Sequence, residues 1–142
     1  MNRFVVDASV AVKWFLHDAT DERDVDIALA LLKTGASGKC SFVQPAHWVG
    51  EIAAVLARRQ PAVAARNIDD LLHFKIYSVV GTATIYGRAI DLSQRLDHHL
   101  FDTLYHAVAL EQGIQFITAD KQYFNKAKKL GNIVMLDSLS VG

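Results

Sequence analysis

Short runs of apolar, often β-branched residues alternate with longer segments of helical periodicity along this sequence of 142 residues. The alternation is typical of a parallel sheet covered by helices on both faces. We therefore predict an α/β fold, a three-layer α/β/α sandwich around a central, mainly parallel sheet of about five strands. The predicted strands are residues 3–7, 41–44, 77–80, 114–119 and 133–136.

Helices are predicted between these strands, several of them opened by a proline or closed by a glycine. Right-handed crossovers should place them on both faces of the sheet, and ligands should then bind outside the carboxyl ends of the strands. The predicted helices are residues 8–16, 25–34, a segment after Pro45 to about residue 59, and residues 61–74, 84–96, 97–112 and 121–130.

Hydrophobic residues make up 51% of the chain, enough to form a core without disulfides or a structural metal, and we expect one globular domain over residues 1–142. The single cysteine, Cys40, has no partner in the chain, which favours a reducing, cytoplasmic location. An acid at position 7 comes too early for a signal-peptide core, and no apolar run approaches the ~20 residues that span a bilayer. We therefore expect a soluble protein with no membrane partner.

Acidic and basic residues balance at 15 each, so the overall charge does not steer the protein toward a polyanion. Local basic clusters are present, and Arg58, Arg59 and Lys121 are candidate phosphate contacts. The simpler interpretation of such clusters is a solvated helix face. Charge alone therefore does not identify a nucleic-acid-binding protein.

Four acids occupy positions from which they could meet. Asp7 and Asp120 each follow a predicted strand directly and should emerge at the same edge of the sheet. Glu51 lies in the second turn of one predicted helix, and Asp102 lies near the start of another. Each has an ordinary alternative explanation, as a helix cap or as an acid near a helix N-terminus. It is the set of four that indicates a site.

Bringing carboxylates together raises their pKa values unless a cation lies among them. Oxygen ligands without His or Cys favour a hard ion, Mg²⁺ or Mn²⁺, whose coordination is usually completed by substrate phosphate. One ion would polarise the phosphoryl group and lower the pKa of an attacking water, and a second, about 4 Å away, would stabilise the leaving oxygen. The set therefore predicts hydrolysis of a phosphodiester.

The segments around these acids resemble the motifs of the PIN-domain family, in their residues, order and spacing and over essentially the whole chain. They are residues 5–14 (VVDASVAVKW), 51–56 (EIAAVL), 101–107 (FDTLYHA) and 118–120 (TAD). The sequence is most similar to the stand-alone VapC-like toxins of prokaryotic toxin–antitoxin pairs.

The resemblance implies a PIN-like fold in which four acids are the catalytic residues and metal ligands, with hydroxyls of Ser9 and Thr118 supporting the metal site. It also implies an endoribonuclease that uses one or two Mg²⁺ or Mn²⁺ ions, forms a homodimer, and binds a cognate antitoxin whose tail occupies the active-site groove. The four acids are Asp7, Glu51, Asp102 and Asp120.

Two departures from the family pattern are visible. Ala54 stands where many relatives carry Asn, and His98 and His99 precede Asp102 at positions where the family varies. Neither departure removes an acid of the predicted site.

Other candidates have simpler explanations. His106 lies one turn beyond Asp102, but a hydrogen-bonded structural histidine is the more frequent case. Three aromatic residues could stack bases, yet their helical spacing favours core or dimer packing. They are Trp14, Phe15 and Trp48. Three acids fit no motif and are interpreted as surface or capping residues: Asp91, Asp97 and Asp137.

Competing functions remain from the sequence alone. A signalling receiver domain would need an acidic pair after the first strand, and a haloacid-dehalogenase-like phosphatase would need a second Asp at position 9, where Ser9 stands. The stronger alternatives share the PIN fold: an RNA-processing or DNA-directed nuclease without an antitoxin, or a binding module with negligible turnover. Which RNA would be cut depends on groove shape, which periodicity does not supply.

Overall fold

The computed structural model describes residues 2–139, and their centre is one sheet of five parallel strands in the order β3-β2-β1-β4-β5. The predicted α/β class and parallel sheet are confirmed. The strands are β1 (Asn2–Val6), β2 (Cys40–Gln44), β3 (Tyr77–Val79), β4 (Gln115–Thr118) and β5 (Ile133–Met135).

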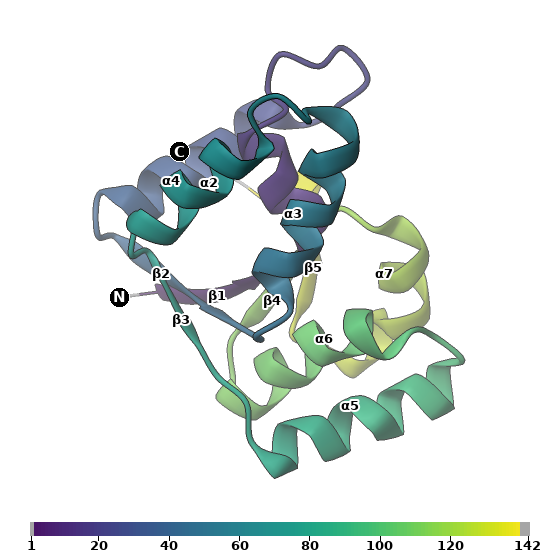
Figure 1. Ribbon diagram of the computed structural model, residues 1–142. Helices are drawn as coiled ribbons and strands as arrows, with labels where there is room; N and C mark the ends of the chain where they lie inside the picture. Colours follow the sequence, from purple (N-terminus) through teal and green to yellow (C-terminus); the bar gives the residue numbers. More distant parts are fainter. Residues whose placement is uncertain (1, 140–142) are drawn as a thin grey trace.

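Helices cover both faces of this sheet (Figure 1). The chain moves outward from β1 through β2 to β3 with α2, α3 and α4 on one side, and it returns to β4 and β5 with α5, α6 and α7 on the other. The α-helices are α1 (Ala8–Ala11), α2 (Val25–Ala36), α3 (Trp48–Arg59), α4 (Ala64–His73), α5 (Ala83–Leu96), α6 (Leu100–Gln112) and α7 (Lys121–Ala127). Short 3₁₀ turns are η1 (Val12–Trp14), η2 (Lys128–Leu130) and η3 (Leu136–Ser138).

Helix α6 is the most deeply buried helix of the described chain. It packs against β1, β2 and β4 on one side and against α5 on the other, so Thr103 and each following residue through Ala109 are buried. A helix enclosed on all sides needs small or apolar residues around its whole circumference. This burial fixes the N-terminal end of α6, and Asp102 with it, over the carboxyl edge of the sheet.

The start of α6 differs from the prediction of a helix over residues 97–112. Asp97 adopts a left-handed conformation, with φ of 49°, and ends α5. Aspartate tolerates this region better than most residues, but the sequence carries no glycine there to signal a break. His98 and His99 therefore form a short connection before α6 begins at Leu100.

Two further helix boundaries differ from the prediction. The segment 8–16 is an α-helix only from Ala8 to Ala11, and it tightens into a 3₁₀ turn, as helix ends often do. Helix α4 begins at Ala64 rather than at residue 61, because Pro61 lies in a turn closed by the Val63 amide donating to the Gln60 carbonyl.

A buried glutamine joins the ends of β1 and β2. The Cα pairing of these strands ends at Phe4 and Phe42. Further along, the Gln44 side chain accepts from the Val6 amide and donates to the Val6 carbonyl, both at 2.8 Å. Gln44 thus satisfies the backbone of the residue that precedes Asp7, which holds the end of β1 in place.

Within residues 2–139, the helices are all too short or too polar to cross a membrane.

Candidate active site

Asp7 lies directly after β1 and caps the N-terminus of α1. Its carboxylate is almost fully buried and accepts a hydrogen bond from the Thr118 hydroxyl at 2.7 Å on Oδ2. The Ser9 amide donates to Oδ1 at 3.4 Å. Asp7 therefore caps α1 through Oδ1, as the sequence suggested, while its Oδ2 contacts Thr118 of β4.

The environment raises the pKa of Asp7 from 3.8 to about 7. Burial is the largest cause, and the negative charges of Asp102 and Glu51 add to it, while the hydrogen bonds from Thr118 and Ser9 act in the opposite direction. A divalent cation beside Asp7 would favour its ionised form. The buried acid among other acids therefore fits a cation site.

Glu51 projects from α3 toward the same edge. The Tyr105 hydroxyl donates to its Oε1 at 2.6 Å, and the His47 Nε2 lies 3.0 Å from the same oxygen. Burial alone would raise the pKa of Glu51, but the hydrogen bonds from His47 and Tyr105 and the His47 charge outweigh it and lower the pKa. Glu51 is therefore held as a carboxylate.

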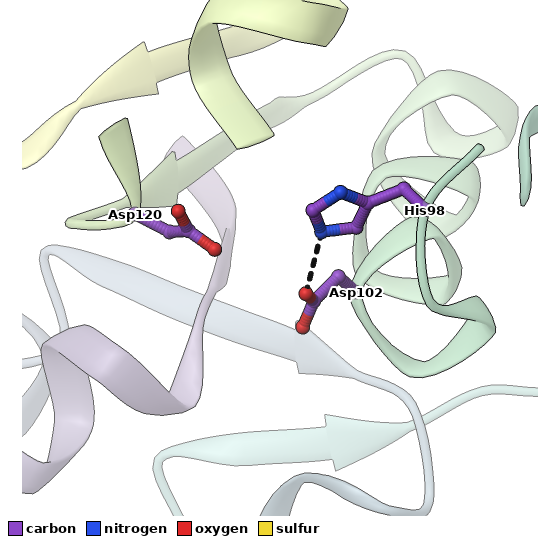
Figure 2. Close-up of side chains that lie close together, drawn as sticks. All are labelled: His98, Asp102 and Asp120. Carbon is purple, nitrogen blue, oxygen red and sulfur yellow. Dashed lines mark hydrogen bonds and ion pairs between the residues drawn. The ribbon is translucent and has the colours of Figure 1, made fainter. Parts of the chain in front are cut away.

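Asp102 and Asp120 approach from α6 and from the end of β4. Asp102 Oδ2 lies 2.8 Å from the His98 Nε2, as Figure 2 shows. Asp120 caps α7 by accepting from the Tyr123 amide at 3.1 Å, and its carboxylate faces His98 and Asp102. One potential ligand atom from each of His98, Asp102 and Asp120 lies within 4.8 Å of the others.

All four predicted acids line one cavity of about 210 Å³. Its wall is completed by four residues of α1, its 3₁₀ continuation and α3: Ala8, Ser9, Val12 and Val55. A larger groove of about 680 Å³ shares Asp102 and Asp120 with it and continues past His98 and Lys126. The acids therefore lie where a small cavity adjoins a larger groove.

The two predicted hydroxyls tie β1 to β4. Thr118 donates to Asp7 and accepts from the Asp120 amide at 3.0 Å. The Ser9 hydroxyl accepts from the Ala119 amide at 3.2 Å. Both hydroxyls thus fix the loops that carry Asp7 and Asp120.

The predicted phosphate contacts lie elsewhere. Arg58, Arg59 and Lys121 line neither the acidic cavity nor the adjoining groove. The Arg59 guanidinium forms ion pairs with Asp21 at 2.6 Å and Glu22 at 2.7 Å, which attach the loop between η1 and α2 to the end of α3. Lys126 lines the groove instead, although Lys121 was the lysine predicted from the sequence.

The remaining candidates occupy the positions that their simpler interpretations suggested. His106 is fully buried, with hydrogen bonds at 2.8 Å to the Tyr123 hydroxyl and the Gly131 carbonyl. Trp14 and Trp48 are core residues in edge contact, and Phe15 packs partly buried against the core. The three acids that fit no motif are exposed and do not line the acidic cavity: Asp91, Asp97 and Asp137.

Sequence reasoning missed the residues that hold the acids. His47 and His98 each stand four residues before an acid, and each contacts that acid in the structure: Glu51 at 3.0 Å and Asp102 at 2.8 Å. The repeated spacing was a usable signal, because each histidine precedes a helix whose first turn carries the acid. Tyr105 carried no such signal, since it contacts Glu51 across 54 positions.

The donor set suits a hard divalent cation. Four carboxylates surround the cavity, and carboxylate oxygen is the ligand that Mg²⁺ and Mn²⁺ prefer. Burial, with a smaller contribution from the charges of Asp102 and Glu51, raises the pKa of Asp7, and a cation in the cavity would oppose that rise. The residues present therefore fit such an ion.

The fold is similar to those of two solved structures. The chain is similar to VapC20 of Mycobacterium tuberculosis, described as a toxin that cleaves the sarcin-ricin loop, with a TM-score of 0.65 and 22% identity over 87% of this chain and 94% of that one. It is also similar to a chain of a toxin–antitoxin complex from Klebsiella pneumoniae, with a TM-score of 0.62 and 13% identity over 96% and 98% of the two chains.

No curated protein sequence matches the chain. The family model described as PIN domain, in contrast, matches residues 4–130, which include all four acids of the cavity. The chain therefore belongs to the PIN domain family.

Proposed function

We propose that the protein is a metal-dependent endoribonuclease that hydrolyses RNA phosphodiester bonds. The observation that carries the proposal is the meeting of Asp7, Glu51, Asp102 and Asp120, from four different elements, around one cavity at the carboxyl edge of the sheet. Membership of the PIN domain family and the similarity in fold to a toxin described as cleaving the sarcin-ricin loop support it.

The four acids would hold one or two Mg²⁺ or Mn²⁺ ions. When bound, such an ion polarises the scissile phosphoryl group and lowers the pKa of the attacking water. Asp7 would bind the ion only in its ionised form, so Thr118 and Ser9 support binding by donating to its carboxylate. Glu51 is kept ionised by His47 and Tyr105 and would bind the ion as a carboxylate.

The groove beside the cavity would bind the RNA strand. It is lined by Asp102 and Asp120 at one end, and Lys126 supplies a positive charge that can contact a phosphate. The balanced charge of the chain gives little attraction to RNA in general. Recognition would therefore depend on the shape of this groove and on few phosphate contacts.

We propose that this nuclease is the toxin of a toxin–antitoxin pair, acting in the cytoplasm as a homodimer. The similarity in fold to a toxin and to a chain of a toxin–antitoxin complex supports this role over that of an RNA-processing or DNA-directed nuclease. A cognate antitoxin would inhibit it by placing a segment in the groove of about 680 Å³ beside the acids. Among residues 2–139, the buried hydrophobic residues gather in one core cluster, which supports one working domain.

The test is cleavage of a mixed RNA pool by purified, antitoxin-free protein with Mg²⁺ or Mn²⁺. Parallel samples contain a chelator, the Asp7→Asn variant, or Asp91→Asn as a matched control at an exposed acid outside the cavity. We expect cleavage that needs the metal and Asp7 but not Asp91. No cleavage, or cleavage that survives Asp7→Asn, would favour a binding module instead.

The toxin role has its own test. Induced expression should arrest growth of a bacterial host, and co-expression of a small protein encoded beside the gene should restore it. Growth arrest that persists in Asp7→Asn would argue against RNA cleavage as its cause. Cleavage without any growth effect would favour a nuclease that has no antitoxin.

A further inference from the structure

His98 is held rigidly beside Asp102. Its ring is almost buried, with 7% of the side chain exposed, and it meets the Tyr123 ring edge-on at 4.9 Å. The His98 amide donates to the Ser93 carbonyl, and the Ser93 hydroxyl donates to the His98 carbonyl. Side-chain and backbone contacts thus fix His98 in the two-residue connection between α5 and α6. A histidine exposed on the surface would not need these contacts.

The two ring nitrogens of His98 face different partners. Nε2 lies 2.8 Å from Asp102 Oδ2, and Nδ1 lies 3.3 Å from the Lys126 Nζ. Lys126 is held in turn by donating to the Asp97 carbonyl at 2.9 Å. An ammonium group can only donate, so Nδ1 must accept, and the proton of a neutral imidazole then lies on Nε2.

We propose that His98 is a positioning residue for the metal ligand Asp102, with Lys126 selecting the tautomer in which Nε2 donates to Oδ2. This inference rests on the proposed function. It concerns the residues that orient one ligand, and no family motif quoted for the chain includes His98 or Lys126.

The geometry gives the contact a clear consequence. Once Oδ2 is held by His98, Asp102 cannot rotate freely, and its other oxygen stays available to the cavity that it shares with Asp7 and Glu51. Replacing a partner that orients a ligand in this way typically costs about 10–100-fold in metal affinity or activity. His98 should therefore set how tightly the ion is bound.

The competing role for His98 is direct coordination. Its nitrogen and the carboxylate oxygens of Asp102 and Asp120 lie within 4.8 Å of one another, and Figure 2 shows all three side chains facing one gap. Coordination needs a lone pair on Nε2, however, and the contact of Lys126 with Nδ1 leaves the proton there. The structure therefore favours donation to Asp102 over a bond to the ion.

The test compares His98→Ala with His98→Gln, because the glutamine amide can replace the Nε2 donor whereas alanine cannot. His73→Ala on α4 is the control, since that histidine is exposed and far along the chain from the site. Mn²⁺ affinity is measured by electron paramagnetic resonance of the free ion, alongside kcat and KM for RNA cleavage. Circular dichroism verifies that each variant is folded.

We expect His98→Ala to weaken Mn²⁺ binding by about 10–100-fold, with a fall in kcat at saturating RNA and little change in KM. His98→Gln and His73→Ala should remain close to the wild type. Equal affinity in the alanine variant, or equal loss in both His98 variants, would overturn the proposal. So would a ¹⁴N coupling to bound Mn²⁺ that disappears in His98→Gln, because it would show coordination by the ring.

The tautomer is tested separately in the metal-free protein. Long-range ¹H–¹⁵N correlation spectra should show the His98 proton on Nε2, and the signal should be assigned by its loss in His98→Gln. A proton on Nδ1 would overturn the role of Lys126. Neither this measurement nor the Mn²⁺ titration needs RNA. If the wild type did not cleave RNA, the proposed nuclease activity would be contradicted, but both measurements would still test the role of His98.

Discussion

The Thr118 hydroxyl donates a 2.7 Å hydrogen bond to Oδ2 of Asp7 across 111 positions of the sequence. Strands β1 and β4 are neighbours, with Val6 in register with Ile117, so the residues that follow them meet at the same edge. Because the Thr118 oxygen also accepts from the Asp120 amide, one buried hydroxyl links two of the four acids. The parallel pairing of two strands thus produces the centre of the site.

Replacing Thr118 by Val should weaken metal binding and cleavage together. The change keeps the side-chain shape but leaves Oδ2 of Asp7 without its donor, which should raise the pKa of Asp7 further. The unfolding free energy should also fall by about 1–3 kcal/mol, the usual cost of a buried polar group that loses its partner. Urea unfolding and a Mn²⁺ titration measure both effects, with the exposed Thr20→Val as control. Unchanged Mn²⁺ affinity would contradict the supporting role of Thr118.

Asp7 should make the metal-free protein less stable as pH rises. Its pKa is about 7 in the folded chain and near 3.8 in the unfolded one, so the folded state binds more protons between these values. The contribution of Asp7 to the free energy of unfolding therefore falls from about pH 4 to about pH 7, on the order of 4 kcal/mol at full ionisation, because one pKa unit corresponds to 1.36 kcal/mol.

Asp7→Asn should lack this pH dependence, and chemical unfolding of both proteins over the same pH range measures the difference. Added Mn²⁺ should reverse the trend in the wild type, since the ion binds only after Asp7 loses its proton. Parallel stability curves for the two proteins would show that Asp7 has an ordinary pKa.

How far the sequence predicts the site depends on where each acid lies. Asp7 and Asp120 follow apolar strands, and the rule that parallel strands end at one edge was enough to bring them together. Glu51 and Asp102 lie on helices, and periodicity does not reveal how a helix is rotated over the sheet. Their place in the set came from the resemblance to PIN-domain motifs.

Replacing Tyr105 by Phe should reduce activity by about 10–100-fold while leaving the fold intact, because the Tyr105 hydroxyl orients Glu51 from the core side. Burial and the nearby charges of Asp7 and Glu51 raise the pKa of Tyr105, so its hydroxyl stays protonated and donates. Initial rates of RNA cleavage measure the effect, with the exposed Tyr86→Phe as control. A wild-type rate would show that Glu51 does not need this contact.

Replacing Gln44 by Leu should destabilise the protein. The change leaves the amide and the carbonyl of Val6 without their 2.8 Å partners in a fully buried position, at about 1–3 kcal/mol for each orphaned group. Urea unfolding measures the loss, and the exposed Gln94→Leu should show none. If the two variants were equally stable, the backbone at the end of β1 would have found another partner.

The features that sequence reasoning missed arise from departures from regular structure. Gln44 fits a strand pattern, and its bridging role exists only because the backbone pairing of β1 and β2 ends two residues earlier on each strand. His98 seemed part of a helix, and its contacts depend on the left-handed conformation of Asp97 that ends α5. The break at Asp97 has no glycine or proline to mark it in the sequence.

The most direct measurement is a crystal structure of the protein grown with Mn²⁺, using the anomalous scattering of the metal to locate it. We expect an anomalous peak inside the cavity lined by Asp7, Glu51, Asp102 and Asp120, and its loss in crystals of Asp7→Asn. A peak only at other sites, or no peak at saturating Mn²⁺, would contradict a metal centre built from these four acids.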